Sequence, residues 1–210
     1  MSSRPYERVG QKLRTRRALL SAAAELVAAG KTPTVAEAAD AAMVSRATAY
    51  RYFPSQEALL VEVPLQVGAP TVQALFGGDA APADPEERVA LVHNALYDYI
   101  SEHEVEFRLL LRNALLRSLD ADRTDEPLRV ANRVELLDAA LVPLEAEIDA
   151  AELEQLKVAL SVLIGTEAVI ALRDVLRLDR EQARVSSERA VRQMVRAVRD
   201  HAAATVHRTR

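Results

Sequence analysis

Residues 16–60, RRALLSAAAELVAAGKTPTVAEAADAAMVSRATAYRYFPSQEALL, contain the pattern that decides the fold. Between Lys12 and Ala29 the apolar residues recur at intervals of three and four, which is the spacing of one helix face. Gly30 follows, at a place where helices commonly end in a left-handed residue. The sequence therefore predicts a first helix that ends at about Ala29.

Capping signals predict two further helices. The pattern T-x-x-E that begins at Thr34 is a capping box, and it predicts a short helix that runs to about Ala41. After a short turn, Ser45 can cap a third helix, which Pro54 ends by disfavouring helical geometry in Phe53. Two helices joined by a short turn form the geometry in which the later helix enters the major groove of DNA.

The predicted third helix is rich in hydrogen-bond donors and aromatic rings. These residues are Arg46, Thr48, Tyr50, Arg51, Tyr52 and Phe53. An arginine can bind O6 and N7 of guanine, whereas hydroxyl groups more often contact phosphates. The alternative is that the rings are core residues beside two surface arginines, and Phe53 is predicted to be such a core residue.

Charge is distributed unevenly along the chain of 210 residues, whose formal net charge is −4. Residues 1–60 hold nine Lys and Arg against five Asp and Glu, a net charge of +4. Residues 61–183 hold eleven against twenty-four (−13), and residues 184–210 hold seven against two (+5). A basic head favours contact with a polyanion, because attraction to phosphate acts over about 8 Å in physiological salt. Ordinary solvated charge is the alternative.

The composition favours an all-α fold. Half of the residues are hydrophobic, only 4% are aromatic, and abundant Ala and Leu leave little β-branched material for strands. Gly and Pro gather within 68–85, which predicts a loop. About nine helices are expected, including a fourth that starts after Ser55 and others over about 85–103, 104–119, 127–148, 150–177 and 180–204. The helix over 127–148 is predicted to bury one stripe, formed by Val130, Val134, Leu137, Leu141, Leu144 and Ile148.

Residues 16–60 resemble the DNA-binding domain of the TetR family of transcriptional regulators. The most diagnostic part is V-S-x-x-T-x-Y-x-Y-F over 44–53, followed by S-x-E-A-L-L at the start of the fourth helix. The resemblance implies an N-terminal three-helix helix-turn-helix domain, residues 1–55. It also implies a C-terminal helical domain for effector binding and dimerisation, residues 56–210.

The resemblance further implies which residues meet DNA. The implied DNA-binding residues are Thr34, Ser45, Arg46, Ala47, Thr48, Tyr50, Arg51 and Tyr52. The four implied to face the groove are Arg46, Ala47, Thr48 and Arg51. Tyr50 and Tyr52 would face phosphates, and Thr34 would offer its helix start to the DNA backbone. Two departures from the family pattern are Met43, which replaces the usual turn glycine, and Gln56, which replaces a frequent phosphate-binding lysine.

By the same resemblance, the protein is expected to be a homodimeric repressor that binds palindromic operator DNA and is released by a small-molecule effector. The last two helices of each subunit would form the intersubunit bundle, a role that Val191, Met194, Val195 and Val198 fit. An arginine stripe at 189, 192, 196 and 199 could be a second nucleic-acid surface. The preferred interpretation is a solvated face, or pairing with acids across the dimer.

Polar residues on the apolar later helices are candidates for an effector site. Glu167 lies within an apolar run and is expected to need a partner, for which Arg112 and Arg108 are the candidates. One hypothesis is an effector pocket lined by Tyr97, Arg112, Asn113 and Glu167. The other is a structural ion pair.

Several function classes lack sequence support. The chain has no cysteine, and its four histidines show no H-x-x-x-H or H-E-x-x-H spacing, so neither a metal nor a cofactor is expected. No nucleotide-binding loop or hydrolase elbow occurs, which argues against an enzyme. No apolar stretch reaches the roughly 18 residues of a membrane span and the N-terminus lacks a signal-peptide core, so a cytoplasmic protein is expected.

Two other function classes stay open at this point. One is a helical small-molecule-binding or scaffold protein with a non-functional DNA-binding head, which Met43 and Gln56 would favour. The other is a small helical enzyme that uses Glu167 with Arg112. Binding of promoter DNA would separate the first class from a regulator, and substrate turnover would be needed to support the second.

Overall fold

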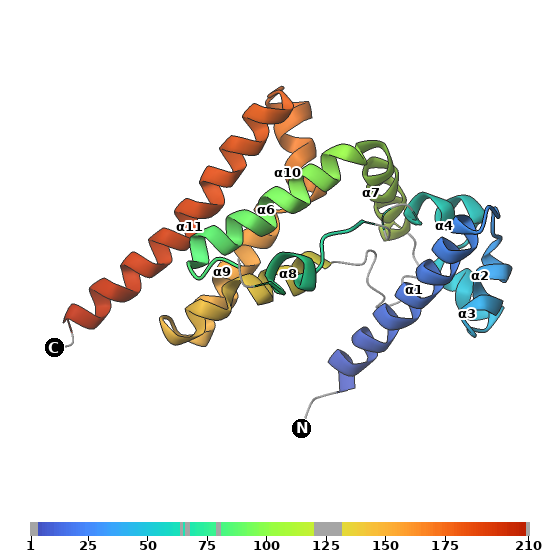
Figure 1. Ribbon diagram of the computed structural model, residues 1–210, viewed down its shortest axis with the longest axis horizontal. Coiled ribbons are helices and arrows are strands. Elements are labelled where there is room, and N and C mark those ends of the chain that lie inside the picture. The colour runs from blue at the N-terminus through green and yellow to red at the C-terminus, as the bar shows by residue number, and fades with distance from the viewer. Residues whose placement is uncertain (1–3, 64, 66–67, 79–80, 120–131, 209–210) are drawn as a thin grey trace. The chain divides into compact units, whose positions relative to one another are not determined.

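The computed structural model describes residues 4–63, 65, 68–78, 81–119 and 132–208. Within these ranges the chain forms helices, turns and bends and no strand, which confirms the expected all-α class (Figure 1). Contacts divide the chain into two compact units, one formed by residues 1–69 with 103–130 and the other by residues 70–102 with 131–210.

The first unit contains the head, which we define as residues 4–63. The helices of the first unit are α1 (Arg4–Ala28), α2 (Val35–Ala41), α3 (Arg46–Tyr52) and α4 (Gln56–Glu62), which belong to the head, and α7 (Glu104–Ser118), which does not. Helix α1 packs against α2, α3 and α4, and α4 also packs against α7. The core of the head is formed by Leu19, Leu20, Ala23, Val35, Ala38, Ala39, Ala49, Tyr52, Phe53, Leu59 and Val63. The small alanines Ala38 and Ala39 of α2 and Ala49 of α3 are buried where the two helices pack together.

The second unit contains the remaining elements. They are α5 (Val72–Phe76), α6 (Pro85–Glu102), α8 (Asn132–Leu141), the 3-10 helix η2 (Val142–Ala146), α9 (Ala150–Leu163), α10 (Thr166–Ile170), the π-helix η3 (Ala171–Val175) and α11 (Arg180–Arg208). The short α5 lies inside the stretch predicted as a loop, which is one reason why the described residues contain eleven α-helices and not about nine. Thr71 caps it by accepting a hydrogen bond from the backbone of Ala74 at 3.1 Å.

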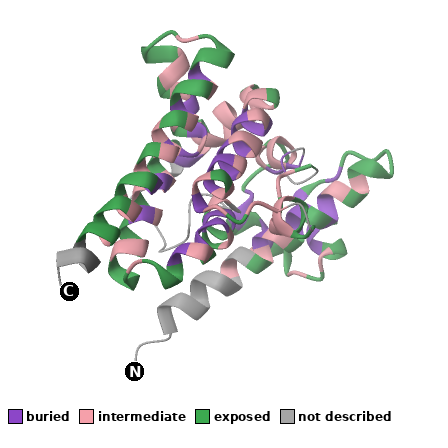
Figure 2. Cartoon of the chain, turned by 60° about the vertical axis from the view of Figure 1, so that its left-hand side comes forward, coloured by how far each residue is buried: buried purple, intermediate pink, exposed green. Residues whose placement is uncertain are grey.

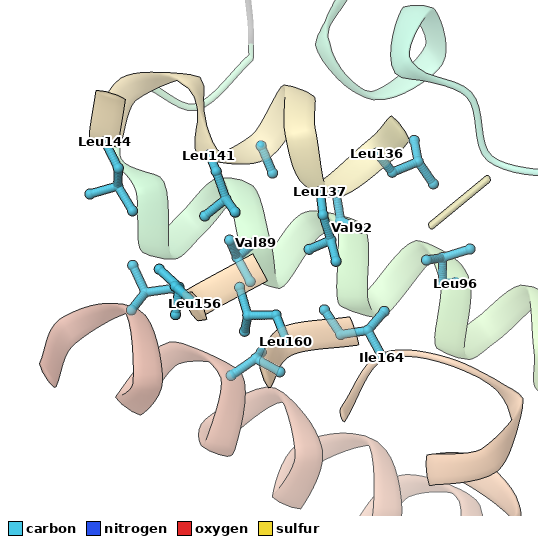
Figure 3. Packing of buried hydrophobic residues seen from close by; sticks show 13 residues of the cluster. Val89, Val92, Leu96, Leu136, Leu137, Leu141, Leu144, Leu156, Leu160 and Ile164 are labelled. Carbon is cyan, nitrogen blue, oxygen red and sulfur yellow. The ribbon is translucent and has the colours of Figure 1, made fainter. Parts of the chain in front are cut away.

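The core of the second unit lies between α6, α8, α9 and α11. Leucines from α8 and η2 gather over Val89 and Val92 of α6, with Leu156 and Leu160 of α9 beneath them (Figure 3). Each fully buried leucine contributes about 1.5–3 kcal/mol relative to an exposed one. This apolar packing fixes the positions of four helices that are far apart in the sequence.

The stripe predicted over 127–148 is partly wrong. Leu137, Leu141 and Leu144 are buried, and Ile148 packs against the core. Val134, however, is 40% exposed. A helical period defines a face, but it does not show where along the helix the neighbouring elements begin. Val130 lies outside the described residues.

The helix predicted over 150–177 is broken in the middle. Helix α9 ends at Leu163, Ile164 is extended, and Gly165 has a φ of 150°, which favours glycine. A side chain at Gly165 would also collide with Arg133, which donates a hydrogen bond to the carbonyl of Ile164 at 3.2 Å. Within the described ranges no single helix is long and apolar enough to cross a membrane, although the bent pair Ala150–Leu163 and Thr166–Val175 meets those two criteria together.

Helix α11 packs along α6, and buried positions alternate with exposed ones along its length (Figure 2). Val191 and Val195 are completely buried in the core of their own chain, and Met194 and Val198 pack against it. These four residues were predicted to face a second subunit. Val191 and Val195 are therefore covered by their own chain and cannot face a second subunit, whereas Met194 and Val198 are only partly buried and their intersubunit role stays a prediction.

Three of the four arginines in the predicted stripe of α11 are paired within the chain. Arg192 bonds to Glu87 at 2.6 Å, Arg196 to Glu86 at 2.8 Å and Arg199 to Asp84 at 2.9 Å. Arg199 also bonds to Glu147, and Arg192 also bonds to Glu188. The predicted acidic partners therefore exist, but they come from α6, η2 and α11 and their flanking residues.

Candidate nucleic-acid interface

A capping box starts α2 at the residue that the sequence predicted. The hydroxyl of Thr34 accepts a hydrogen bond from the backbone N–H of Glu37 at 3.2 Å, and the backbone N–H of Thr34 donates to the Glu37 carboxylate at 2.7 Å. The backbone N–H and the hydroxyl of Thr34 both donate to the Glu37 carboxylate, and they lower the pKa of Glu37 because they stabilise its charged form. Thr34 is exposed at the start of the helix, where its predicted contact with the DNA backbone stays a prediction.

The turn between α2 and α3 passes through Met43. This residue has a φ of 55°, in the left-handed region, and its side chain is 94% exposed. A residue with a side chain costs about 1 kcal/mol in that conformation, which explains why glycine is usual there. The backbone N–H of Val44 closes the turn by donating to the carbonyl of Ala39 at 2.9 Å. The turn keeps its geometry without glycine.

Ser45 caps α3, as predicted. Its hydroxyl oxygen accepts from the backbone N–H of Thr48 at 3.2 Å, and its O–H donates to the Thr48 hydroxyl at 2.8 Å. Ala49 and Tyr52 are buried against the head core and set the rotation of the helix. The hydroxyls of Ser45 and Thr48 therefore both belong to the hydrogen-bonded N-cap of α3.

The rotation of α3 brings four of the predicted DNA-binding residues onto one exposed face: Arg46, Ala47, Tyr50 and Arg51. Thr48 is half-buried beside them. Tyr52 lies on the opposite side of α3 and is 8% exposed, so it matches the core alternative for the aromatic rings. Its predicted phosphate contact stays a prediction. Phe53 is buried in the core, as expected.

Arg46 is paired with Asp40, a residue that the sequence analysis did not single out. The Nη2 of Arg46 donates to Oδ2 of Asp40 at 2.7 Å, and its Nε donates to Oδ1 at 3.3 Å. This pair lowers the pKa of Asp40 and raises that of Arg46. The two residues stand six positions apart on either side of a turn, so no helical spacing could have revealed the pair.

Gln56 has a structural role that the sequence did not show. Its side-chain amide donates to the carbonyls of Thr32 at 3.1 Å and Pro33 at 3.2 Å. Ser55 caps the same helix by accepting from the backbone N–H of Ala58. Gln56 therefore joins the start of α4 to the loop before α2, whatever contact with phosphate it makes or lacks.

Arg16 braces the head from inside. Its guanidinium carbon lies 4.5 Å from the centroid of the Phe53 ring, and its Nη2 donates to both carboxylate oxygens of Glu62, at 2.5 and 2.6 Å. The side chain of Arg16 is 3% exposed and that of Glu62 is 12% exposed. A charge so deeply buried needs its partner, so this pair fixes α1 to α4.

The residues predicted to line an effector pocket are divided between the two units. Tyr97 and Glu167 belong to the second unit, whereas Arg112 and Asn113 belong to the first. Tyr97 is buried and donates to the carbonyl of Arg180 at 2.8 Å. Arg112 is exposed and donates to the side chain of Asn113 at 3.1 Å.

Glu167 differs in environment from what the apolar sequence around it suggested. It stands in the first turn of α10, and its side chain is 45% exposed. Arg133 of α8 lies 3.4 Å from its carboxylate, which makes Arg133 a partner that the sequence analysis missed. Of the two predicted arginine partners, Arg108 bonds to Glu104 at 2.7 Å. In the described part of the chain, no cluster of three or more His, Asp or Glu is placed to hold a metal ion.

Comparison with known proteins identifies the head. Residues 19–63 match the family of bacterial regulatory proteins of the tetR type. The match begins in α1, covers α2 and α3 and ends just after α4, so it contains the exposed face of α3. Searches among curated proteins and among solved structures give no match. Residues 19–63 therefore form a helix-turn-helix domain of the tetR family, the DNA-binding part of such regulators.

Proposed function

We propose that the protein is a homodimeric, ligand-responsive repressor that binds palindromic operator DNA in the cytoplasm and is released by a small-molecule effector. The observation that carries this proposal is the face of α3 that exposes Arg46, Ala47, Tyr50 and Arg51 within a family-matched helix-turn-helix head. In such a head the later helix enters the major groove. Residues 1–55 would then read DNA, and residues 56–210 would bind the effector and the second subunit.

Exposed apolar residues of the second unit support dimerisation. Val158 and Val162 of α9 are 59% and 70% exposed, and Val175 and Leu176 are 75% and 61% exposed. Val158 and Val162 lie one helical turn apart, so they share a face. This face, and not Val191 and Val195, is the surface that a second copy would cover.

The dimer is tested by sedimentation of the purified protein and two variants. Val162→Glu places a charge on the exposed α9 face and is expected to shift the protein toward monomer. Val134→Glu places the same charge at an exposed position of α8 and serves as the control. A monomeric wild-type protein, or dimers that survive both changes, would contradict the proposed interface.

A cavity in the second unit supports ligand binding. It is lined in part by Tyr97 and His93 of α6, Ser187 of α11 and Leu172 of η3, and it lies beside the helix break at Gly165. Its volume is only about 10 Å³, at the lower limit of what holds one water molecule. A larger effector would have to displace side chains such as Leu172. Among the predicted pocket residues, Tyr97 lines this cavity; Arg112, Asn113 and Glu167 stay predictions.

The effector site is tested by screening compounds for a shift in thermal unfolding and for release from operator DNA. Ala168→Leu fills the cavity, since Ala168 lines it, whereas Ala171→Leu adds the same bulk at an exposed position nearby. A compound that acts on the wild type and on Ala171→Leu, but not on Ala168→Leu, would support this site. Equal action on all three would exclude it.

DNA reading is tested first, by selecting random duplex DNA with the purified protein at two salt concentrations. Enriched sites with two-fold symmetry, bound more weakly at the higher salt, are expected. Tyr50→Phe is expected to weaken binding evenly across sequences, because a phosphate contact carries no base information. Absence of enrichment from folded protein would instead favour a ligand-binding protein with a non-functional head.

A further inference from the structure

The ion pair between Asp40 and Arg46 spans the turn of the helix-turn-helix. Asp40 lies in the last turn of α2, and Arg46 is the first residue of α3. The side chain of Arg46 is 64% exposed and that of Asp40 is 57% exposed. Both therefore lie on the surface of the head, at the start of the helix whose exposed face is expected to meet DNA.

The geometry of the pair leaves one particular edge of the guanidinium available. A guanidinium carries five N–H groups in a rigid plane. Asp40 accepts from Nε and from Nη2, so it occupies the side edge of the group. Nη1 and the second N–H of Nη2 form the end edge, and this pair of parallel donors matches O6 and N7 of guanine in the major groove.

The fold of the head does not depend on this pair for its helix packing. Ala38, Ala39 and Ala49 are already buried between α2 and α3, and the turn is closed by the bond from Val44 to Ala39. Exposed ion pairs contribute little to folding. A carboxylate on a surface that approaches phosphates also weakens DNA binding. The position of Asp40 is therefore better explained by its orienting effect on Arg46 than by a contribution to folding or to DNA affinity.

We infer that Asp40 is a positioning residue for base recognition: it holds the side edge of Arg46 so that the end edge is presented to a guanine. This inference rests on the proposed DNA reading by α3 and adds the residue that orients its first arginine. Because Asp40 already holds the Arg46 guanidinium in the free protein, Arg46 loses less rotamer freedom when it binds DNA. The fixed orientation also favours a two-bond contact with one base over a loosely oriented contact with phosphate.

The test measures base preference at every operator position for the wild type, Asp40→Asn, Arg46→Ala and the double variant. Glu25→Gln is the control, because Glu25 is exposed on α1 and its change also removes one negative charge from the head. Asp40→Asn is expected to lower the preference for guanine at one base pair of each half-site by about 3- to 10-fold, a part of what a bidentate contact provides. Arg46→Ala should remove the preference at the same position, and the double variant should lose nothing more.

Three outcomes would overturn the inference. Unchanged base preference in Asp40→Asn would reduce the pair to a surface ion pair. A stronger guanine preference in Asp40→Asn than in Glu25→Gln would mean that Asp40 restrains Arg46 from DNA. Unchanged preference in Arg46→Ala would remove the arginine from base reading. If the folded wild type selects no sequence at all, the proposed DNA reading fails as well, so the two failures are distinguishable.

Discussion

The head and the C-terminal helix are both basic, yet their arginines have different surroundings. Residues 184–210 carry a net charge of +5, slightly more than the +4 of residues 1–60. In α11, Arg192, Arg196 and Arg199 are each bonded to acids of the same chain, whereas α3 exposes Arg46 and Arg51 beside Tyr50. Net charge does not distinguish the two regions, but the positions of the acids do: Arg46 pairs with Asp40 across the turn of the head, whereas the α11 arginines pair with acids of α6 and its flanking residues.

The largest expected effect compares a buried arginine with an exposed one. Glu62→Gln leaves the charge of Arg16 buried without its carboxylate, so the free energy of unfolding should fall by about 3 kcal/mol. Glu86→Gln removes the partner of Arg196, whose side chain is 61% exposed, and should cost no more than about 1 kcal/mol. Urea unfolding of both variants measures the difference. Equal losses would contradict the distinction between the two regions.

The second effect concerns DNA affinity. Arg51→Ala on the exposed face of α3 should weaken binding to the selected operator by about 1–3 kcal/mol. Arg196→Ala should leave it unchanged, because Arg196 belongs to the interface of α11 with α6. Titrations with labelled operator DNA at one fixed salt concentration would check both. Equal weakening would show that the C-terminal helix also contacts DNA.

The third effect is a loss of stability at low pH, which is expected in the second unit because His93 is buried there. Burial lowers the pKa of His93 below 6.5, and the hydrogen bond with Asn94 opposes this only partly. Because the unfolded chain then binds a proton more readily than the folded one, His93 lowers stability as the pH falls below about 6.5. His93 lies between α6 and α11, where it bonds to Ser187 at 2.8 Å.

Thermal unfolding at pH 7.5 and 5.5 would measure this effect. The wild type should lose more of its Tm on acidification than His93→Gln, which does not titrate. The helix-turn-helix, observed through a probe placed on α3, should not open before the second unit does. A Tm difference that is the same in both proteins would show that His93 does not contribute.

The smallest effect concerns the turn before α3. Met43→Gly should raise the free energy of unfolding by about 0.5–1 kcal/mol, because the exposed side chain packs against nothing that would be lost and the left-handed φ suits glycine. Ala41→Gly, two residues earlier in α2, should lower it by a similar amount. Opposite signs are the expected result of urea unfolding; a loss in both variants would contradict the strain at Met43.

Local signals predicted the head well and the second unit less well. Thr34, Ser45 and Ser55 cap helices where the sequence placed them, because a cap depends on residues only three positions away. The break near Gly165 was missed, since its apolar surroundings continue the helical pattern on both sides. What stabilises the break is Arg133, which comes from another helix and could not be identified from the local sequence.

The same limit applied to the candidate sites. The exposed face of α3 followed from family spacing, but the partner of Arg46 did not, because Asp40 reaches it across a turn. The tail arginines were expected to form a solvated face or to pair with acids across a dimer, whereas Arg192, Arg196 and Arg199 pair with acids of the same chain. Contacts between elements decide such questions, and a single sequence does not encode them in any fixed spacing.

Because of the break at Gly165, a displacement at one end of residues 150–177 is not transmitted along a single rigid helix. An unbroken helix over 150–177 would be a single lever about 42 Å long, at 1.5 Å per residue. Instead α9 and the segment after it meet at 45°, and the hydrogen-bond ladder of α9 ends at Ile164 while that of α10 begins at the carbonyl of Gly165. A change of angle at this joint would break no helical hydrogen bond. Arg133 binds the carbonyl of Ile164 and the carboxylate of Glu167, so side-chain contacts, and not a continuous helical ladder, hold the angle of this joint.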